Sequence, residues 1–381
     1  MENKNIDKNL FVPAKKRDDE SDKISRPSRT FLQDVTRSIV RNIPAISSII
    51  ILLIIIIMSF AGPSMNDYGF DDQDLSRAKL PPRVAALENI SWLGFDGKLE
   101  GTYDGDDVED ATKNAYARYS NKEEFIEIEV LDEGDGTNDS AQVKASYAVY
   151  EAKGLTDTYF WFGTDGLGRD QWTRVWEGTR ISLYIAFLAA IIDLVIGVAY
   201  GGISAYYGGR VDNVMQRIIE VLVGIPNLVV VLLMIIVLEP GILSITIALT
   251  ITGWTGMARI VRGEILKLKN QEFVLASRTL GAPDRKIIIR HLVPNVVGLI
   301  IINTMFTIPS AIFFEAFLSF IGLGITPPEA SLGSLIESGF ETIRIYPYML
   351  LYPAIIISII MIAFNLLADG LRDAFDPKMR D

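Results

Sequence analysis

Few residues of this 381-residue chain have side chains that could carry out chemistry. The sequence lacks cysteine, so it has no disulfides, no thiol nucleophile and no cysteine-based zinc site. Its only histidine is His291, which excludes a histidine cluster, and we expect no metal site. It also lacks the GxxxxGK[ST] sequence of P-loop nucleotide-binding proteins. We therefore expect no catalytic residues and no cofactor bound by this chain.

Two carboxylates stand within apolar stretches long enough to cross a membrane, Asp193 and Glu315. A charge at the centre of a bilayer costs about 3 kcal/mol or more, so such residues usually face the interior of a helix bundle or a water-filled path. Each could line a translocation path and bind a cationic group such as an amino terminus. Each could instead form a hydrogen bond with a neighbouring helix, which is the commoner role. For Asp193 we expect a position that water can reach.

Two other patterns suggest ligand chemistry that their spacing does not support. Gly163, Gly166 and Gly168 resemble a phosphate-binding loop, but they match neither GxGxxG nor GxxxxGK, and we reject nucleotide binding. The acidic turns at Asp104 and Asp132 suggest calcium, but neither has the glutamate eleven residues later that an EF-hand loop needs. We interpret them as solvent-exposed acidic turns.

Six apolar segments can cross a membrane, since a helix needs about 20 apolar residues to span the hydrocarbon core. Their predicted ranges are 43–61, 181–206, 214–238, 242–261, 296–323 and 348–367. Pro226 should kink the third of them, and a break is expected near Pro309 in the fifth. The predicted fold class is an all-α polytopic membrane protein with about six transmembrane helices.

The basic residues predict which ends of these helices face the cytoplasm. Residues 1–42 form a basic tail, flexible up to Arg29 and with an interfacial helix over 30–41. Basic residues also follow the fourth and sixth segments. Because cytoplasmic flanks of membrane helices are rich in lysine and arginine, both termini are expected in the cytoplasm. Residues 62–158 are then an extracellular insert, and 159–381 form a core with the five further helices.

The extracellular insert has about twice as many acidic as basic residues. Ile126, Ile128 and Val130 alternate with glutamates, which predicts a half-buried strand, and a second strand is expected around 143–149. The sequence LDEGDGTNDS between them is rich in turn-forming residues. We therefore expect a small insert that contains β-structure.

The polar, basic stretch 271–295 lies between the fourth and fifth spans, and we predict a helical hairpin there. A first helix should end at Gly281, since glycine readily adopts the positive φ of a helix C-terminus. Pro283 suits the first turn of a second helix, which Pro294 should end. On the cytoplasmic face, a soluble partner could hold such a hairpin and move the membrane helices at both of its ends.

The apolar side and the turn of this hairpin are expected to form its coupling surface. The residues concerned are Phe273, Ala276, Leu280, Gly281, Ala282, Pro283, Ile287, His291, Leu292 and Pro294. Arg285, Lys286 and Arg290 lie on the other side of the second helix, where we expect solvent or lipid.

The hairpin resembles the EAA loop of ABC-importer permeases, whose pattern is Glu-Ala-Ala, three residues, Gly, and later Ile-x-Leu-Pro. The matching residues are Ala276, Gly281, Val293 and Pro294. The departures are Leu275 for Glu, Ser277 for the second Ala and His291 for Ile.

Other segments resemble the dipeptide and oligopeptide branch of this family more closely. Before the second span the matches are Gly163, Thr164, Asp165, Gly168, Arg169, Asp170, Arg174, Gly178, Arg180, Ser182 and Leu183. Further matches include Asp212, Met215, Arg217, Pro226, Trp254, Ala258, Arg259, Arg262, Asn365, Asp369, Gly370, Arg372, Asp373, Asp376 and Pro377. The resemblance is to the C-type permease subunit, and it covers about 41–61 and 160–381 but not the acidic insert.

The resemblance implies an ATP-driven importer of dipeptides or oligopeptides in the bacterial cell membrane. The chain would form the path with a second, B-type permease, and two cytoplasmic ATPase subunits that bind ATP and Mg would hold the hairpin. An extracellular binding protein would deliver peptide near Asp165, Arg169 and Asp170. For these three residues we nevertheless favour capping and pairing within their loop. The lipid bilayer is a further partner, and no nucleic acid is expected.

Two alternatives remain open. Related permeases also carry nickel or other small solutes, and the sequence does not distinguish these from peptides. A proton-coupled secondary transporter would use Asp193 and Glu315, but the hairpin and the lack of a charge relay argue against it. The insert is expected to dock or shield the binding protein.

Overall fold

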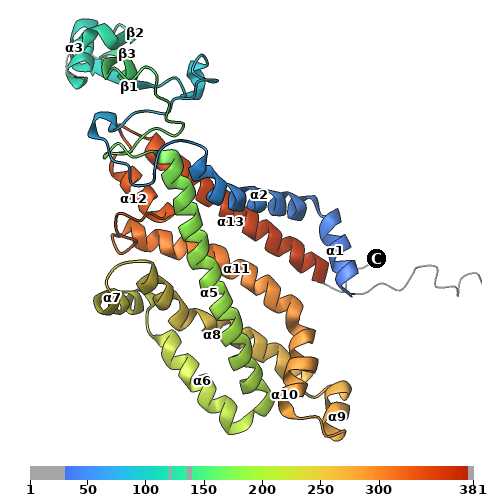
Figure 1. Ribbon diagram of the computed structural model, residues 1–381. Coiled ribbons are helices and arrows are strands. Elements are labelled where there is room, and N and C mark those ends of the chain that lie inside the picture. Colours follow the sequence, from blue (N-terminus) through green and yellow to red (C-terminus); the bar gives the residue numbers. More distant parts are fainter. Residues whose placement is uncertain (1–30, 120–121, 135–139, 376–381) are drawn as a thin grey trace, which may run out of the picture.

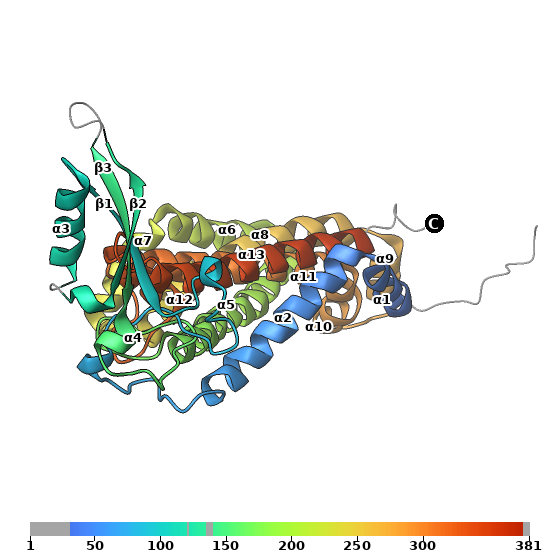
Figure 2. The same ribbon diagram turned by 90° about the horizontal axis from the view of Figure 1, so that it is seen from above.

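The computed structural model describes residues 31–119, 122–134 and 140–375. A body of long helices carries a small insert of strands and helices at one end (Figure 1). Helices α1 (Phe31–Arg41) and α9 (Glu272–Thr279) lie at the end opposite to this insert (Figure 2). The predicted fold class, a helical polytopic protein with a β-containing insert, is confirmed. The predicted flexible tail up to Arg29 lies outside the described residues.

Among the described residues, five helices are long and apolar enough to cross a membrane. They are α2 (Ile43–Ala61), α5 (Gln171–Tyr207), α8 (Ile242–Leu268), α11 (Val293–Phe320) and α13 (Tyr348–Phe375). Helices α6 (Gly209–Gly224) and α7 (Asn227–Leu238) pass the same test as a pair, which gives up to six spans. The second span is longer than expected, because α5 begins at Gln171 and not near 181.

Prolines affect these helices in different ways. At Pro226 the chain bends by 80° between α6 and α7, so the predicted kink is confirmed. Pro309 lies inside α11 and is buried there, so the predicted break is wrong. Pro294 does not end the second hairpin helix either, because α10 (Asp284–Ile287) continues through a π-helical segment into α11. Packing by neighbouring helices allows a membrane helix to continue past a proline that lacks its N–H donor.

The insert is a three-stranded antiparallel sheet covered by a helix. Its strands are β1 (Lys98–Gly105), β2 (Ile126–Asp132) and β3 (Ala141–Ala148), in the order β1-β3-β2. Helix α3 (Val108–Arg118) packs Ala111 and Ala115 against Val143 of the central strand. This small core is separate from the cores of the helix bundle.

The two predicted strands of the insert are confirmed, except that Val149 belongs to the short helix α4 (Val149–Ala152). Strand β1 and helix α3 have no counterpart in the sequence prediction. Residues 135–139 of the predicted turn lie outside the described residues. The predicted outer connection 324–347 also contains an unexpected helix, α12 (Leu332–Glu341), which Ser331 caps.

Helix α5 packs closely against α8 through small residues. A Cβ atom at Gly201 would lie 2.3 Å from the carbonyl oxygen of Ala258, and one at Gly197 would lie 2.6 Å from Cβ of Met257. Glycines spaced four apart allow two membrane helices to approach with their backbones nearly in contact. This approach fixes the C-terminal half of α5 beside α8.

Much of the apolar surface is not covered by this chain. Ile236 is 77% exposed and Val221 is 68% exposed. In a membrane, exposed apolar side chains of a span face lipid or a second membrane protein. The helix bundle therefore has exposed apolar surface for contact with lipid and with a second membrane protein.

Candidate functional site

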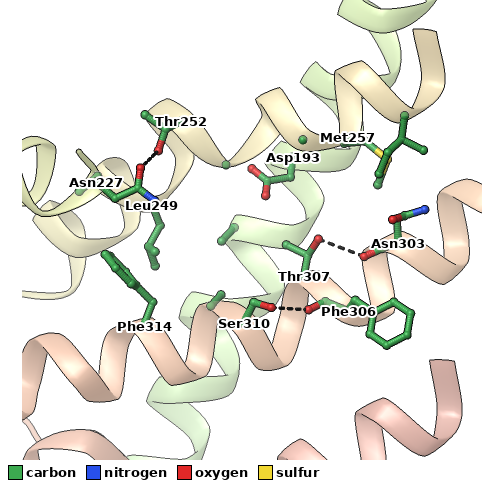
Figure 3. A pocket seen from close by; sticks show the side chains of 16 residues that line it. Asp193, Asn227, Leu249, Thr252, Met257, Asn303, Phe306, Thr307, Ser310 and Phe314 are labelled. Carbon is green, nitrogen blue, oxygen red and sulfur yellow. Dashed lines mark hydrogen bonds between the residues drawn. The ribbon is translucent and has the colours of Figure 1, made fainter. Parts of the chain in front are cut away.

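A cavity of about 440 Å³ lies between α5, α7, α8 and α11, and Asp193 of α5 lines it (Figure 3). The residue is only 6% exposed, and its Oδ1 atom has no hydrogen-bond partner among the described residues. A Cβ atom at Gly253 of α8 would lie 2.7 Å from each carboxylate oxygen. The absence of a side chain at Gly253 thus makes room for the carboxylate at the wall of the cavity.

The other polar groups of the cavity are uncharged. Thr252 of α8 donates to the side-chain oxygen of Asn227 at 3.0 Å, and Thr307 of α11 donates to the Asn303 carbonyl at 3.1 Å. The described residues that line the cavity include no lysine or arginine. A single unpaired carboxylate among neutral groups suits a cationic ligand group such as a protonated amine.

Glu315 of α11 lies away from this cavity, in a buried network of serines. One of its oxygens accepts a hydrogen bond from Ser182 of α5 at 3.2 Å, and the other accepts one from Ser319 at 2.9 Å. Ser182 in turn accepts from the Leu332 N–H at the start of α12, also at 3.2 Å. Glu315 is fully buried and connects three helices. These contacts are those of the helix-packing alternative, and a place of Glu315 on the path stays a prediction.

Asp165, Arg169 and Asp170 form contacts within and next to their own loop. Asp165 accepts from the Arg169 backbone N–H at 3.0 Å and pairs with Arg169 Nε at 2.7 Å. Asp170 caps α5 by accepting from the Thr173 N–H at 2.8 Å, and it also accepts from Asn66 at 2.7 Å. Burial raises the pKa of Asp170, although the hydrogen bonds from Thr173 act in the opposite direction. The loop thus shows the capping and pairing expected of it.

The hairpin turns at Gly281, whose φ is +77°. The Gly281 N–H donates to the Arg278 carbonyl at 3.0 Å, and the Ala282 N–H donates to the Ser277 carbonyl at 3.1 Å. This pair of hydrogen bonds is a Schellman helix end, which favours glycine at the left-handed position. Pro283 precedes α10 as its N-cap residue and does not stand in the first turn as expected.

Tyr206 of α5 joins both halves of the hairpin to the spans. Its hydroxyl donates to the Asp284 carboxylate at 2.6 Å, and the guanidinium of Arg278 lies 5.2 Å from the centre of its ring. Ile287 and Leu292 are fully buried in the same apolar cluster. They anchor the hairpin within this chain, and their predicted place on the coupling surface stays a prediction. Local sequence gives no indication of the Tyr206 contact, because its partner lies 78 positions away.

The tip of the hairpin is exposed. Leu280 is 87% exposed and Phe273 is 41% exposed. Among the other predicted coupling residues, Ala282 and His291 are half-buried, and the exposed ones are Ala276, Gly281, Pro283 and Pro294. An anchored hairpin with an exposed leucine at its tip offers a contact surface to another protein.

An ion pair near the hairpin joins α6 to α8. Nε and Nη2 of Arg262 each lie 2.6 Å from a carboxylate oxygen of Asp212. Ser204 of α5 also donates to Asp212, and Lys269 donates to the Ala205 carbonyl at 2.8 Å. Two-point contacts of this kind fix orientation as well as distance. The hairpin thus rises from a base in which α5, α6 and α8 are bonded together.

These features define a multi-span membrane protein with a cavity between its helices and an anchored hairpin at the end opposite to its insert. Residues 194–381 match the family described as the inner membrane component of binding-protein-dependent transport systems. Residues 30–82 match the N-terminal transmembrane domain of oligopeptide transport permease C. The chain belongs to the permease family of binding-protein-dependent ABC importers.

Similar proteins extend this likeness over nearly the whole chain. The dipeptide transport system permease protein DppC of Bacillus subtilis is 39% identical over 97% of this chain and 93% of its own length. The oligopeptide transport system permease protein OppC of the same organism is 37% identical over 99% of both. DppC of Lactococcus lactis is 39% identical over 98% of both. The resemblance to C-type permeases is confirmed and includes the acidic insert, which the motif matches do not cover.

Proposed function

We propose that this chain is a transmembrane permease subunit of an ATP-driven importer of dipeptides or oligopeptides in the bacterial cell membrane. The similar proteins are permeases of dipeptide and oligopeptide systems. The observation that carries the proposal is the hairpin, which combines an exposed tip with a base bonded to the spans. Such a hairpin suits the transfer of motion from a soluble partner to membrane helices.

In the proposed assembly the chain contacts three kinds of protein and the lipid bilayer. A second, B-type permease completes the path and covers part of the exposed apolar surface, and the lipid bilayer covers the rest. Two cytoplasmic ATPase subunits bind ATP and Mg and contact the hairpins of the two permeases. An extracellular binding protein delivers peptide at the end that carries the insert. The termini lie in the cytoplasm, a topology supported by the position of α1 at the hairpin end (Figure 2).

In this assembly Phe273, Ala276 and Leu280 contact an ATPase subunit. ATP-dependent closure of the ATPases displaces the tip of the hairpin. Because Tyr206 and Ile287 hold the base, the displacement passes to α5 and α11 instead of bending the turn. The spans then alternate between inward-facing and outward-facing arrangements.

Asp193 is the proposed contact for the amino terminus of the peptide. Its carboxylate is unpaired at Oδ1 and faces a cavity without lysine or arginine among the described lining residues. Because the chain has no cysteine, Asp193→Cys and Glu315→Cys can each be labelled alone. A water-soluble maleimide should react with the first and not with the second. An unreactive thiol at position 193 would count against a water-filled path there.

The proposal is tested by purifying the chain with its partners and measuring ATP-dependent uptake of a labelled dipeptide. Leu280→Glu should lose the ATPase subunits and the uptake, because it places a charge on the apolar contact. Leu280 is a better position for this substitution than Leu292. Because Leu292 is buried, a charge there could unfold the hairpin, and this would be mistaken for loss of the contact. Leu280→Met is the matched control, since it keeps an apolar side chain at the same exposed position.

Retention of both the ATPases and the uptake by Leu280→Glu would overturn the coupling role of the hairpin. Uptake that needs no ATP would favour the proton-coupled secondary transporter. Uptake of nickel without uptake of peptide would show that the proposed substrate is wrong, but it would not contradict the coupling role of the hairpin.

A further inference from the structure

The insert distributes its basic residues unevenly. Residues 62–158 include 22 acidic and nine basic residues. Five of the basic residues form ion pairs with carboxylates of the insert, namely Arg77, Arg83, Lys98, Lys113 and Lys144. The other four are Lys79, Arg118, Lys122 and Lys153, none of which has an ion pair among the described residues. All four line the same pocket.

This pocket has a volume of about 310 Å³ and lies where the insert meets the outer end of the bundle. Tyr119 and Tyr147 of the insert, whose rings are stacked at 4.7 Å, contribute to its wall. Tyr346, from the segment before α13, contributes as well. None of the described residues that line the pocket is acidic. A concave basic surface thus occurs within an insert that is otherwise strongly acidic.

Neutral groups hold the lysines in position. Lys122 Nζ donates to the Ala152 carbonyl at 2.8 Å, and Lys153 Nζ donates to the Ala78 carbonyl at 2.7 Å. Each ammonium group has two further N–H donors, because a lysine carries three. The lysines are therefore fixed by the backbone but not neutralised by it.

The charges of the pocket also act on one another. Burial, and then the charge of Lys122, lower the pKa of Lys153, although Asp74 acts in the opposite direction. The ammonium group of Lys79 lies 5.3 Å from the centre of the Tyr346 ring, which is a weaker partner than a carboxylate. An anion placed between these side chains would offset their repulsion.

We propose that this pocket binds the carboxylates of a short acidic peptide segment. Four cations exceed the charge of one carboxylate, so a ligand with two or more carboxylates fits best. The tyrosine rings offer apolar surface for the rest of the segment. The segment belongs either to a free peptide or to the surface of a protein that docks on the insert. Binding requires neither ATP nor transport, so its failure is distinguishable from failure of the proposed function.

The test uses the full chain in nanodiscs of phosphatidylcholine, titrated with Asp-Asp-Asp and with neutral Asn-Asn-Asn. We expect binding of the acidic peptide only, and a loss of about tenfold or more in the variant Lys122→Gln/Lys153→Gln. The matched control Lys113→Gln/Lys144→Gln removes the same charge from two ion-paired lysines. Equal losses in the two variants, or equal binding of Asn-Asn-Asn, would overturn the proposal.

Two further titrations define the ligand chemistry. Inorganic phosphate should bind more weakly than Asp-Asp-Asp, and tighter binding of phosphate would overturn the carboxylate assignment. Asp-Asp-Asp with an amidated C-terminus separates the two sources. Unchanged binding supports side-chain carboxylates such as a docking protein presents, and weaker binding supports the terminal carboxylate of a free peptide. Arg118→Gln, on the exposed surface of α3, provides a single substitution should the double variant fail to fold.

Discussion

The serine network around Glu315 and the cavity around Asp193 each hold a carboxylate inside an apolar helix bundle, and they treat it in opposite ways. Glu315 is fully buried, and both of its oxygens accept hydrogen bonds from serines. Asp193 is nearly as buried, but its Oδ1 has no partner among the described residues, and the residue lines a cavity. Burial alone therefore does not distinguish a structural carboxylate from one that is free for a ligand.

The difference lies in the partners that surround each group. A buried carboxylate is tolerated where hydrogen bonds replace its lost hydration. The network around Glu315 supplies those bonds from α5 and from α11 itself, and the side chain thus connects the two helices. In the cavity around Asp193, water or a ligand would have to supply the hydrogen bond that Oδ1 lacks. Four predictions test this contrast.

The largest effect is expected for Glu315→Leu. The substitution removes an acceptor from Ser182 and Ser319 and should lower the free energy of unfolding by about 2–4 kcal/mol. Thermal unfolding of the purified chain measures this loss. Glu315→Gln, which keeps an acceptor and the shape, should lose much less. A leucine variant as stable as the original protein would show that the network does not hold the helices together.

Asp193→Asn should affect transport and leave stability unchanged. It removes the negative charge but keeps the shape, so the concentration for half-maximal uptake should rise about tenfold or more for peptides with a free amino terminus. N-acetylated peptides should be taken up equally by both forms. If the variant takes up both kinds of peptide as well as the original protein does, Asp193 does not bind the amino terminus. Asp193 would then be a structural carboxylate like Glu315.

Gly253→Ala should cause a smaller, several-fold loss of uptake. The added methyl group would lie 2.7 Å from the Asp193 oxygens and force the carboxylate to move. Gly256→Ala is the matched control, because Gly256 lines the same cavity on the same helix and has no atom within 4 Å of an added Cβ. If the two alanines reduce uptake equally, the position of Asp193 is not the cause.

Ser319→Ala should have the smallest effect. It removes one hydrogen bond of 2.9 Å to Glu315, which is worth about 1 kcal/mol. The midpoint of thermal unfolding should fall slightly, and uptake should stay the same. Ser358→Ala, on the exposed face of α13, removes a bond to a backbone carbonyl of its own helix and should change nothing. A loss of uptake in Ser319→Ala alone would link the network to transport.

The sequence predicts the spans well, because length and apolar composition decide whether a helix can cross a membrane. It does not predict which of the two carboxylates is satisfied. The partner of Glu315 on α5 lies 133 positions away, and no local pattern relates the two residues. The same limit applies to Pro309, where neighbouring helices keep α11 continuous although the residue itself favours a break.

The insert shows a similar limit in its sheet. Strand β1 has the sequence KLEGTYDG, with two glycines and few apolar residues, and nothing in it predicts a strand. It becomes one by pairing with β3, where Leu99 lies opposite Tyr147 and Tyr103 opposite Val143. The basic pocket is also invisible in the sequence, since its four cations are spread between Lys79 and Lys153.

Helix α5 runs for 37 residues without interruption, from its cap at Asp170 to Tyr207. At 1.5 Å per residue it is about 55 Å long, and it joins the loop that precedes it, the cavity carboxylate and the hairpin anchor along one axis. Each residue turns an α-helix by about 100°. The number of residues between Asp170 and Tyr206 therefore sets the direction in which Tyr206 points around the helix axis relative to Asp170. Inserting a single residue into α5 would rotate Tyr206 away from Asp284 even if every side-chain contact elsewhere were kept. The length of this helix is therefore as much a part of the transport machinery as any of its side chains.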